Sequence, residues 1–420
     1  MKRDVAIVGA GYVGLPLAQV FAEAGRSVLL VDVNAPRVDQ INRGESYIED
    51  VPSETLKRLV EGGLAATTDY DELREADAIL IALPTPLSKQ REPDLSIVLS
   101  ATEEIARRLR AGHLVVLEST TYPGTTRGDL LPILERGSGL TAGTDFHLAF
   151  SPERVDPGRT DWTTQNVPKV VGGITDACTE AAAALYGTAI ETVHRVSTPE
   201  AAELTKLLEN IFRSVNIALV NELAMLCDRM KIDVWEVIGA AATKPFGFMS
   251  FKPGPGLGGH CIPIDPFYLT WKAREFDFTT RFIELAGEVN QNMPYYCRSL
   301  VSQALNHGAG KSLSEARLLV LGVAYKPDIG DMRESPALKL IELLRTAGAE
   351  VSYHDPHVPA VAELGLESVS LEEGLAECDL AVIVTAHEEV DPKVVVDRAQ
   401  RVLDLRGATR DIEADHVVRL

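Results

Sequence analysis

The N-terminal stretch up to Asp32 constrains the fold more than any other part of this chain. Residues 4–8 (DVAIV) are a β-branched run that predicts a strand, and the turn GAGYVG at 9–14 follows directly. Apolar residues then recur at helical spacing over 15–22, and residues 27–31 predict a second strand that ends in Asp32. Strand, glycine turn, helix, strand and acid follow the order of a dinucleotide-binding βαβ unit. The chain is therefore predicted to begin with an α/β, Rossmann-like domain.

Each glycine of this turn has its own task in such a unit. Gly9 allows the tight turn, Gly11 lets a pyrophosphate approach the backbone, and Gly14 packs the helix on the strand. The helix N-terminus offers N–H groups and positive potential to the phosphates. The alternative is a glycine turn with a purely structural role, but the acid at the end of the second strand favours a dinucleotide. The predicted contacts in this turn are Gly9, Gly11, Tyr12, Val13 and Gly14.

The acid at the end of the second strand predicts which dinucleotide binds. Asp32 can accept hydrogen bonds from both adenosine-ribose hydroxyls, and its charge would repel a 2′-phosphate. We therefore expect NAD rather than NADP. Arg37 lies close enough in sequence to weaken this preference, and it is counted among the cofactor contacts.

The sheet continues with three more predicted strands, at 78–83, 114–118 and 147–150. Polar or turn residues follow each strand, and in a doubly wound sheet the carboxyl ends of the strands line the ligand crevice. Any one of these residues could instead cap a helix or make a turn, but three on successive strands favour a site. The residues expected to face the cofactor are Thr85, Thr120 and Glu153.

Residues 196–231 predict one long helix, which either Ser197 or Thr198 could cap. Its apolar residues recur at helical spacing and cover more surface than one domain contact needs, which predicts a homodimer interface. A polar stripe at i, i+4 and i+7 projects from one face of the same helix. Such a stripe is usually solvated, but few charges follow it, so most of the helix should be buried. The stripe consists of Lys206, Asn210 and Arg213.

The loop at 253–265, PGPGLGGHCIPID, places Cys261 directly after two glycines and His260. Gly258 and Gly259 have no Cβ, so a backbone or a ligand can approach closely there. A buried structural cysteine in a turn is the alternative. The glycine pair and the nearby Asp265 favour chemistry at the thiol. Another helical stretch, 267–305, is predicted after this loop.

A second α/β unit begins near residue 317. It consists of a strand (RLLVLG), a loop (AYKPDIGDMRE), a helix with Ser335 as N-cap and Pro336 at its first position, and a strand (EVSYHD). Further strands are predicted at 380–385 and 402–405. This repeats the N-terminal plan without the glycine motif, so we expect two Rossmann-like doubly wound domains joined by a long central helix. The predicted divisions are 1–195, 196–306 and 307–420, and the loop residues suited to phosphates or a base are Tyr325, Lys326, Asp331 and Arg333.

Composition excludes several other classes. The net charge of −20 argues against nucleic acid and anionic membranes as partners, and no apolar run is long enough to span a bilayer. The N-terminus enters a strand and a turn directly, so no signal peptide is predicted. Five scattered cysteines without CxxC spacing indicate a reducing cytoplasm and neither a disulfide framework nor a zinc site, and no metal is implied.

Taken together, the glycine turn, the Lys206–Asn210 helix, the loop around Cys261 and YKPDIGDMRESP resemble the nucleotide-sugar 6-dehydrogenases over essentially the whole chain. That family includes UDP-glucose dehydrogenase and the dehydrogenases of UDP-N-acetylated hexosamines. The resemblance implies an N-terminal NAD domain, a C-terminal domain for the UDP group of the substrate, and a dimer built on the central helix. It also implies an oxidation that consumes two NAD, with a thioester intermediate on the enzyme, and a product for polysaccharide or small-metabolite synthesis.

The resemblance also implies individual roles. Cys261 would be the nucleophile, Lys206 and Asn210 would lie beside the sugar C6 oxygen, and Asp265 would assist deprotonation. The pair expected to orient water is Glu153 with Thr120. Lys326 and Lys252 would contact the UDP portion, and Arg333 would reach the NAD pyrophosphate. The other residues matched to the sugar-nucleotide site are Arg154, Val155, Arg213, Gly258 and Tyr325.

Two differences from the UDP-glucose dehydrogenases indicate the branch of the family to which the chain is most similar. UDP-glucose dehydrogenases usually carry a second acid where this chain has Pro157, and the loop GGHCIPIDP is similar to that of the acetamido-sugar branch. UDP-N-acetylglucosamine is the predicted substrate, with UDP-N-acetylmannosamine, UDP-N-acetylgalactosamine and UDP-glucose as alternatives. Two other classes are weaker: a two-electron 3-hydroxyacid dehydrogenase has no use for Cys261, and a nucleotide-binding protein without activity needs neither Cys261 nor Lys206.

Overall fold

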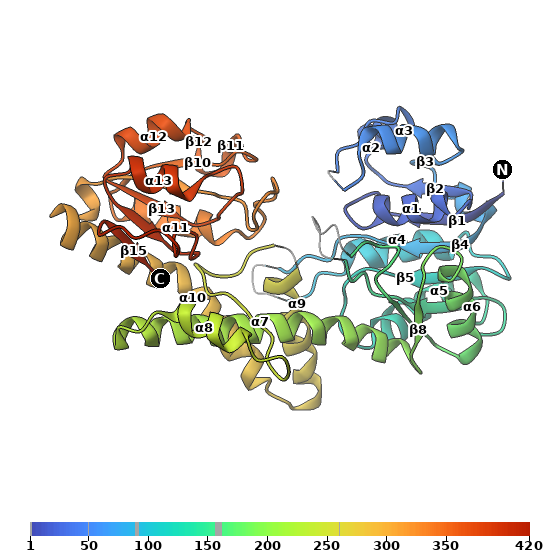
Figure 1. Cartoon of the computed structure of the whole chain (residues 1–420). Helices are drawn as coiled ribbons and strands as arrows, with labels where there is room; N and C mark the ends of the chain where they lie inside the picture. Colours follow the sequence, from blue (N-terminus) through green and yellow to red (C-terminus); the bar gives the residue numbers. More distant parts are fainter. Residues whose placement is uncertain (1, 49, 89–91, 156–161, 260) are drawn as a thin grey trace. The chain divides into compact units, whose positions relative to one another are not determined.

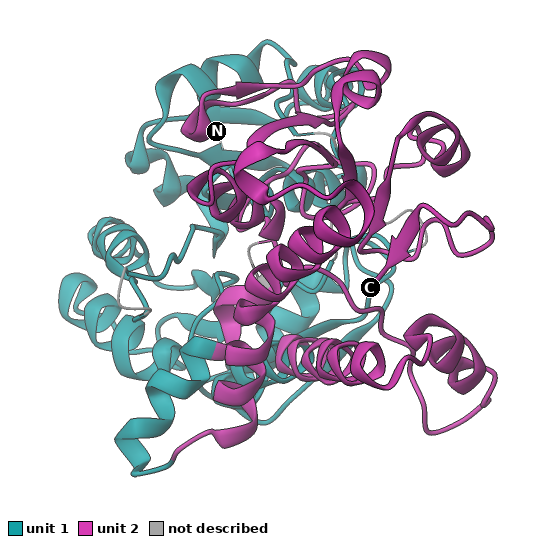
Figure 2. Ribbon diagram, turned by 90° about the vertical axis from the view of Figure 1, so that its left-hand side faces the viewer, with its two compact units in different colours: residues 1–209, 267–278 teal, residues 210–266, 279–420 magenta. Residues whose placement is uncertain are grey.

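The computed structural model describes residues 2–48, 50–88, 92–155, 162–259 and 261–420. Contacts divide the chain into two compact units, one made of residues 1–209 and 267–278 and the other of residues 210–266 and 279–420 (Figure 2). The chain therefore crosses between the units three times. The three-part division predicted from the sequence stays a prediction.

The first unit is built on one sheet with the strand order β3-β2-β1-β4-β5-β6-β7-β8. Strands β1 to β5 and β8 are labelled in Figure 1. Neighbouring strands are parallel except β6 and β7, which are antiparallel. The predicted strands are present with shifts of at most two residues at each end. The bounds are β1 (Arg3–Val8), β2 (Val28–Val31), β3 (Ala65–Thr67), β4 (Ala76–Ile81), β5 (Leu114–Leu117), β6 (His147–Phe150), β7 (Lys169–Gly173) and β8 (Val193–Arg195).

Both faces of this sheet are buried, as the continuous apolar strands require. Val5 and Ile7 of β1 pack in one core with α1, α3 and α6, while Ala6 and Val8 pack in the other with α4 and α5. Alternation of side chains along the strand divides these residues between the two layers. The helices are α1 (Gly14–Glu23), α2 (Ala35–Asn42), α3 (Ser53–Glu61), α4 (Ser96–Ala106), α5 (Leu131–Ser138) and α6 (Asp176–Tyr186).

The second unit contains a parallel sheet with the order β10-β9-β13-β14-β15. Alternate residues of β9 pack on α11 and α10 on one face and on α12 and α13 on the other. Ser335 caps α11 and Pro336 opens it, which confirms the prediction. The bounds are β9 (Arg317–Leu321), β10 (Glu350–His354), β13 (Leu380–Ile383), β14 (Val402–Asp404), β15 (Val417–Arg419), α11 (Pro336–Thr346), α12 (Leu371–Glu377) and α13 (Pro392–Arg398), with a short pair β11 (Ala360–Val361) and β12 (Leu366–Glu367).

The long helix α7 runs over Pro199–Met230, and α8 (Val234–Ala242) follows it. Thr198 accepts the Ala201 N–H, so Thr198 rather than Ser197 is the cap. One side of α7 exposes large apolar residues, among them Leu208, Leu219 and Met230, each more than half exposed. No helix among the described residues is long and apolar enough to cross a membrane.

The helical stretch predicted at 267–305 is wrong in two respects. Helix α9 (Cys261–Ala273) begins six residues earlier, with Pro263 in its first turn, where a missing N–H costs nothing. The helix then ends, because Asp277 adopts a left-handed φ of 52° and the backbone turns there. Helix α10 (Arg281–Ala309) is a separate element.

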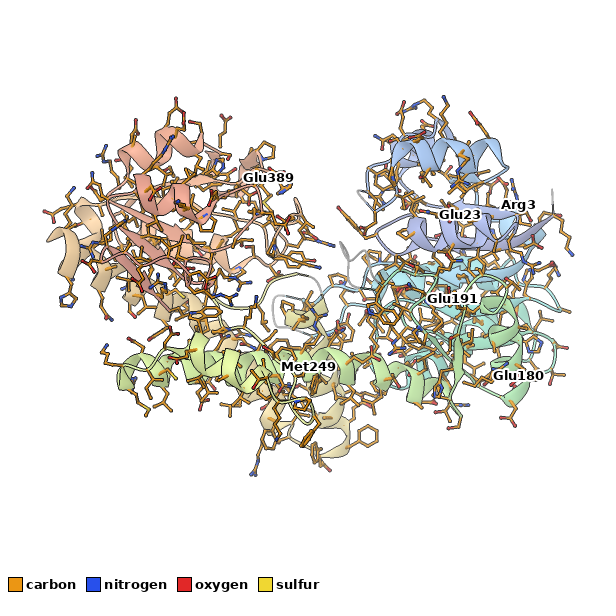
Figure 3. The ribbon with its side chains drawn as sticks, viewed as in Figure 1. Arg3, Glu23, Glu180, Glu191, Met249 and Glu389 are labelled. Atoms are coloured by element: carbon orange, nitrogen blue, oxygen red, sulfur yellow. The ribbon has the colours of Figure 1, made fainter. Side chains whose placement is uncertain are left out.

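The surface of the first unit carries part of the chain's large negative charge. Glu23, Glu180 and Glu191 are exposed there, and their side chains can be followed in Figure 3. Basic residues at the site must therefore supply the positive potential for an anionic ligand.

Candidate active site

The glycine turn has the geometry that the sequence predicted. Gly9 has φ +104°, and a Cβ there would lie 2.4 Å from the Ala82 carbonyl oxygen. A Cβ on Gly14 would lie 1.8 Å from the Gly9 carbonyl oxygen, so helix α1 can pack this closely only with glycine. A Cβ on Gly11 would meet nothing within 4 Å, which leaves the turn open beside the start of α1. These residues fit a dinucleotide pyrophosphate.

Asp32 directly follows β2 and is a buried acid with several partners. Its carboxylate accepts the Ala10 N–H and the Asn34 N–H, both at 2.9 Å, and forms an ion pair with Arg37 at 3.1 Å. The Arg37 guanidinium also lies over the Tyr47 ring. Asp32 is thus fixed beside the glycine turn, and the basic residue that could weaken NAD preference is paired with it.

Thr120 and Lys206, predicted from separate motifs, come together in the first unit. Lys206 is 8% exposed, and its ammonium group donates a hydrogen bond to the Thr120 hydroxyl. Thr85 is buried after β4, and its carbonyl accepts the Tyr268 hydroxyl at 2.7 Å. The carboxyl ends of adjacent strands β4 and β5 therefore supply Thr85 and Thr120 as expected, while their contact with a cofactor stays a prediction.

The sequence missed a carboxylate that holds this region. Glu203, one helical turn before Lys206, accepts the Gly124 N–H at 2.6 Å and the Thr126 N–H and hydroxyl at 2.9 and 2.7 Å. It thereby fixes the loop that follows Thr120. Burial raises the pKa of Glu203 to about 7, although these three hydrogen bonds oppose the rise. Its place in α7, three residues before Lys206, was the available signal.

Glu153 lies after β6 in a buried polar cluster. One of its carboxylate oxygens accepts the Arg154 and Val155 N–H groups at 2.8 Å, and the other lies 3.3 Å from the Lys169 ammonium group. Lys169 also forms an ion pair with Glu118 at 2.6 Å. Neither Lys169 nor Glu118 was predicted as a site residue, because neither belongs to a motif.

Arg154, expected near the sugar nucleotide, has its guanidinium engaged within the first unit. It donates to Glu209 of α7 at 2.6 Å and to the Pro168 carbonyl at 2.5 Å. Arg154 therefore contacts Glu153 through its backbone N–H and not through its guanidinium. Pro157, on which the branch prediction depends, lies outside the described residues.

In the second unit, Asn210 and Asp265 meet. The Asn210 amide donates to the Asp265 carboxylate at 2.6 Å, and Asp265 is 1% exposed. Cys261 opens α9 one helical turn before Asp265. The placement of the Cys261 side chain and of His260 lies outside what the structure describes.

The glycine loop before α9 is packed tightly within the second unit. A Cβ on Gly258 would lie 2.5 Å from the Tyr325 Cβ, and the Gly259 N–H donates to the Arg333 carbonyl at 2.9 Å. Buried Asn221 of α7 accepts the Gly254 N–H at 3.0 Å. Gly258 is therefore required for close packing against Tyr325. A ligand contact at either residue stays a prediction.

The basic residues predicted for phosphate binding are all in this unit. Arg333 forms a bidentate ion pair with Asp331, and Lys252 is exposed. Lys326 lies in the same loop as Arg333. Their contacts with UDP or NAD, like that of Arg213, stay predictions.

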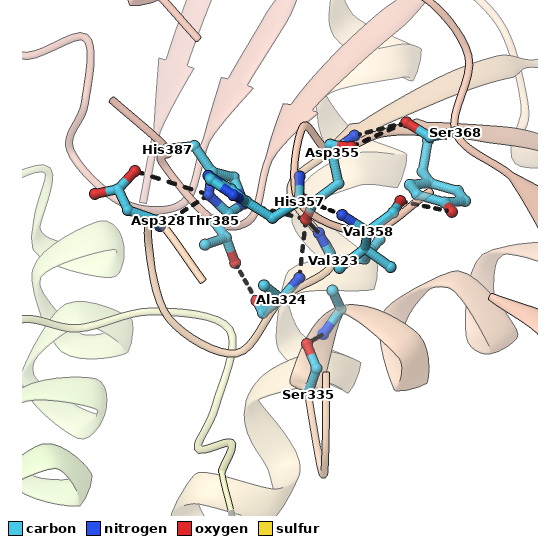
Figure 4. A network of polar contacts seen from close by, with 12 residues as sticks. Val323, Ala324, Asp328, Ser335, Asp355, His357, Val358, Ser368, Thr385 and His387 are labelled. Carbon is cyan, nitrogen blue, oxygen red and sulfur yellow. Dashed lines mark hydrogen bonds and ion pairs between the residues drawn. The ribbon is translucent and has the colours of Figure 1, made fainter. Parts of the chain in front are cut away.

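The second unit repeats the backbone turn of the first. Gly322 has φ +82°, and a Cβ there would lie 2.3 Å from the Thr385 carbonyl oxygen, as at Gly9. Asp355 follows β10 and accepts the Val323 and Ala324 N–H groups at 2.7 and 3.0 Å (Figure 4). Burial opposes ionisation, but the hydrogen bonds from His387 and the backbone lower the pKa of Asp355 to about 2.

The fold also brings together Asp328, His357 and His387. Their side-chain atoms that could coordinate a metal ion lie within 4.8 Å of one another (Figure 4). Sequence spacing could not reveal this group, because its members come from separate loops. His387 Nδ1 accepts the Asp328 N–H at 2.9 Å, and its Nε2 lies 3.1 Å from the Asp355 carboxylate. One ring nitrogen of His387 therefore holds the loop that carries Lys326, and the other contacts Asp355 after β10.

Comparison with known proteins agrees with this geometry. Three models of the UDP-glucose/GDP-mannose dehydrogenase family match: its NAD-binding domain at residues 3–190, its central domain at 200–292 and its UDP-binding domain at 319–411. An NDP-N-acetyl-D-galactosaminuronic acid dehydrogenase from Ralstonia nicotianae is 38% identical, covering 96% of both chains.

Two further relatives are named for other sugars. A UDP-N-acetyl-D-glucosamine 6-dehydrogenase from Pseudomonas aeruginosa is 35% identical over 92% of this chain and 90% of its own. A solved structure of a UDP-D-ManNAc dehydrogenase from Pyrococcus horikoshii superposes with a TM-score of 0.90 at 33% identity, covering 99% of this chain and 98% of its own. The names of these three relatives thus refer to three different acetamido sugars.

Proposed function

We propose, from the premise that this chain belongs to the UDP-glucose/GDP-mannose dehydrogenase family and is an NAD-dependent UDP-sugar dehydrogenase, a more specific reaction. In this reaction the enzyme oxidises C6 of a UDP-N-acetylhexosamine to the carboxylate. UDP-N-acetylglucosamine is the first candidate, and the N-acetylmannosamine and N-acetylgalactosamine epimers are the alternatives. The observation that supports the chemistry is that α7 carries both Lys206, which is buried and donates to Thr120, and Asn210, which donates to Asp265.

Oxidation of a primary alcohol to a carboxylate removes four electrons, so the reaction requires two hydride acceptors, and two molecules of NAD would supply them. The Gly9–Gly14 turn and Asp32 would hold the dinucleotide. The residues of the chain must then retain the aldehyde and move protons. We propose that the Cys261 thiolate adds to the aldehyde carbon, which keeps it covalently bound through the second oxidation.

Lys206 and Asn210 would stabilise the oxygen on C6 as it becomes negative. A buried ammonium group suits this task because its positive charge is not screened by water. Asp265, held by Asn210, would take the proton of the C6 hydroxyl. Glu153 with Thr120 would orient the water that cleaves the resulting thioester and releases the Cys261 thiol. This mechanism requires a reduced thiol, and a cytoplasmic setting is proposed with it.

The substrate assignment depends on the acetamido group. Arg213 follows Asn210 by three residues on α7 and could donate to an acetamido carbonyl. Arg154 supports the assignment less, because its guanidinium is engaged by Glu209. A donor left without its acceptor costs roughly 1–3 kcal/mol, so UDP-glucose should be a slow substrate and not an excluded one.

The test is an NADH-release assay with a panel of UDP-sugars. We expect two NADH per sugar and the highest kcat/KM with an acetamido sugar. Arg213→Ala should narrow the ratio between acetamido sugar and UDP-glucose, whereas Arg229→Ala, on the exposed part of the same helix, should leave it unchanged. A higher kcat/KM with UDP-glucose would contradict the substrate assignment, and a single NADH per sugar would contradict the thioester route.

A further inference from the structure

Lys169 is a buried lysine between two carboxylates. It is 3% exposed, and its ammonium group lies 2.6 Å from Glu118 and 3.3 Å from Glu153. Glu118 is 1% exposed and also accepts a hydrogen bond from the Tyr186 hydroxyl. Charged groups are rarely buried unless they are paired, because desolvation is costly. The cluster therefore requires an explanation beyond packing.

The position of Lys169 follows from the direction of its strand. Strands β5 and β6 are parallel and end at one edge of the sheet, where Glu118 and Glu153 follow them. Strand β7 runs antiparallel to β6, so its first residue lies at that same edge. Lys169 is that first residue. A parallel strand would place its first residue at the opposite edge, and the ammonium group could not reach either acid.

Glu153 is held on both of its oxygens. Oε1 accepts the N–H groups of Arg154 and Val155, and Oε2 faces Lys169. Burial alone would raise the pKa of Glu153, but Lys169, the two N–H groups and Lys206 of α7 lower it below its ordinary value. In contrast, burial raises the pKa of Glu118 despite Lys169. The pKa values of the two acids in this cluster are thus shifted in opposite directions.

We propose that Lys169 is a positioning residue that keeps the Glu153 carboxylate ionised and oriented to accept a proton from the hydrolytic water, while Glu118 and Tyr186 hold Lys169 in place. The proposal rests on the role assigned to Glu153 above. As the water oxygen bonds to the thioester carbon, the carbon–sulfur bond to Cys261 breaks and one water proton passes to Glu153. A protonated Glu153 could not accept it.

The test compares two variants that differ only at Lys169. E118Q removes one buried anion and keeps Lys169, whereas E118Q/K169M removes an anion and a cation together and so avoids an unpaired buried charge. We expect the apparent pKa of the acid limb of the kcat–pH profile to be at least about one unit higher in E118Q/K169M than in E118Q. At pH values below this limb, kcat should therefore be about tenfold lower. In the first turnover, E118Q/K169M should form NADH as fast as E118Q does, because only the later hydrolysis step needs Glu153. Identical profiles for the two variants would overturn the proposal.

Three further measurements separate this proposal from the proposed function and from simple misfolding. K169R keeps the charge, so its acid limb should match that of the wild type, and a rise of one unit would overturn the proposal. E153Q tests the role of Glu153 itself, and full turnover by E153Q would contradict the role in hydrolysis that the proposed function gives to Glu153. The ionisation of Glu153 can also be measured independently of activity, from its infrared carboxylate band. This band is obtained with 13C-labelled glutamate as the difference between the spectra of the enzyme with and without E153Q. An ionised Glu153 in E118Q/K169M throughout the shifted pH range would overturn the inference about Lys169 alone.

Discussion

The Asn210 amide donates a hydrogen bond of 2.6 Å to the Asp265 carboxylate, which is almost completely buried in the second unit. This bond ties α7 to α9, the helix that begins at Cys261. Asn210→Ala removes a donor from a buried carboxylate and, under the proposed mechanism, from the C6 oxygen. We expect kcat to fall by about 100-fold or more, as for other lost oxyanion donors.

A matched control for this variant is available on the same helix. The Asn216 amide donates to the Phe212 carbonyl within α7, so Asn216→Ala should keep kcat within about twofold. Steady-state kinetics of both variants with one UDP-sugar provide the comparison. Equal losses in the two variants would show that the Asn210 effect is not specific to the site.

Only Cys261 is expected to react as a nucleophile. The four cysteines whose side chains are described are free and buried. Burial raises the pKa of Cys297 to about 12 and that of Cys378 to about 11, so both thiols stay protonated at neutral pH. Cys261→Ser should abolish turnover and preserve UDP-sugar binding, whereas Cys297→Ala should retain activity. Calorimetric binding and NADH release measure the two effects, and a fully active Cys261→Ser enzyme would contradict the thioester intermediate.

NAD should be used at least about 100-fold more efficiently than NADP. The fixed carboxylate of Asp32 would face the 2′-phosphate, and two like charges about 4 Å apart cost up to roughly 4 kcal/mol near a protein surface. Arg37 offsets part of this cost. Asp32→Gly leaves Arg37 without its acidic partner, and the kcat/KM ratio should move toward NADP. Comparable efficiency of the wild type with both cofactors would refute the prediction.

Glu203 should make the fold less stable as the pH rises toward neutral. Its folded pKa of about 7 lies above the ordinary value of 4.5, so the folded state holds a proton that the unfolded state releases. The contribution of Glu203 to the free energy of unfolding is fully present below pH 4.5. It decreases by roughly 3 kcal/mol as the pH rises from there through pH 7. The Tm difference between Glu203→Gln and wild type should therefore change across this window. Glu200→Gln, a partly exposed residue on the same helix, should show little change, and a flat difference for Glu203→Gln would rule out the assigned titration.

The exposed apolar side of α7 should form a homodimer. Leu219 is 55% exposed and Leu223 is 38% exposed, and a charge placed in a buried contact costs several kcal/mol. L219D/L223D should give monomers by light scattering at micromolar concentration. Ile97→Asp, an exposed apolar position in the first unit, should leave the mass unchanged. A monomeric wild type would contradict this prediction directly.

The sequence by itself determined the elements whose signals are local. β-Branched runs, the Gly9–Gly14 turn, Asp32 and the Ser335 cap act through backbone geometry within a few residues, and the structure has each of them where the sequence predicts. The end of α9 was missed because Asp277, which adopts the left-handed backbone after it, carries no strong breaker signal in the sequence. Thr120 and Lys206 were both found because each belongs to its own motif.

Only the tertiary structure decided which charges meet. Lys169 contacts Glu118 and Glu153 because β7 reverses direction beside β6, and no period or spacing in the sequence shows that reversal. The same holds for His387 and Asp355, which are joined through the order of the second sheet. A buried charge is stable only with partners, and these partners lie far apart in the chain. Local patterns specify strands and helices, whereas strand order and direction determine the electrostatics of the site.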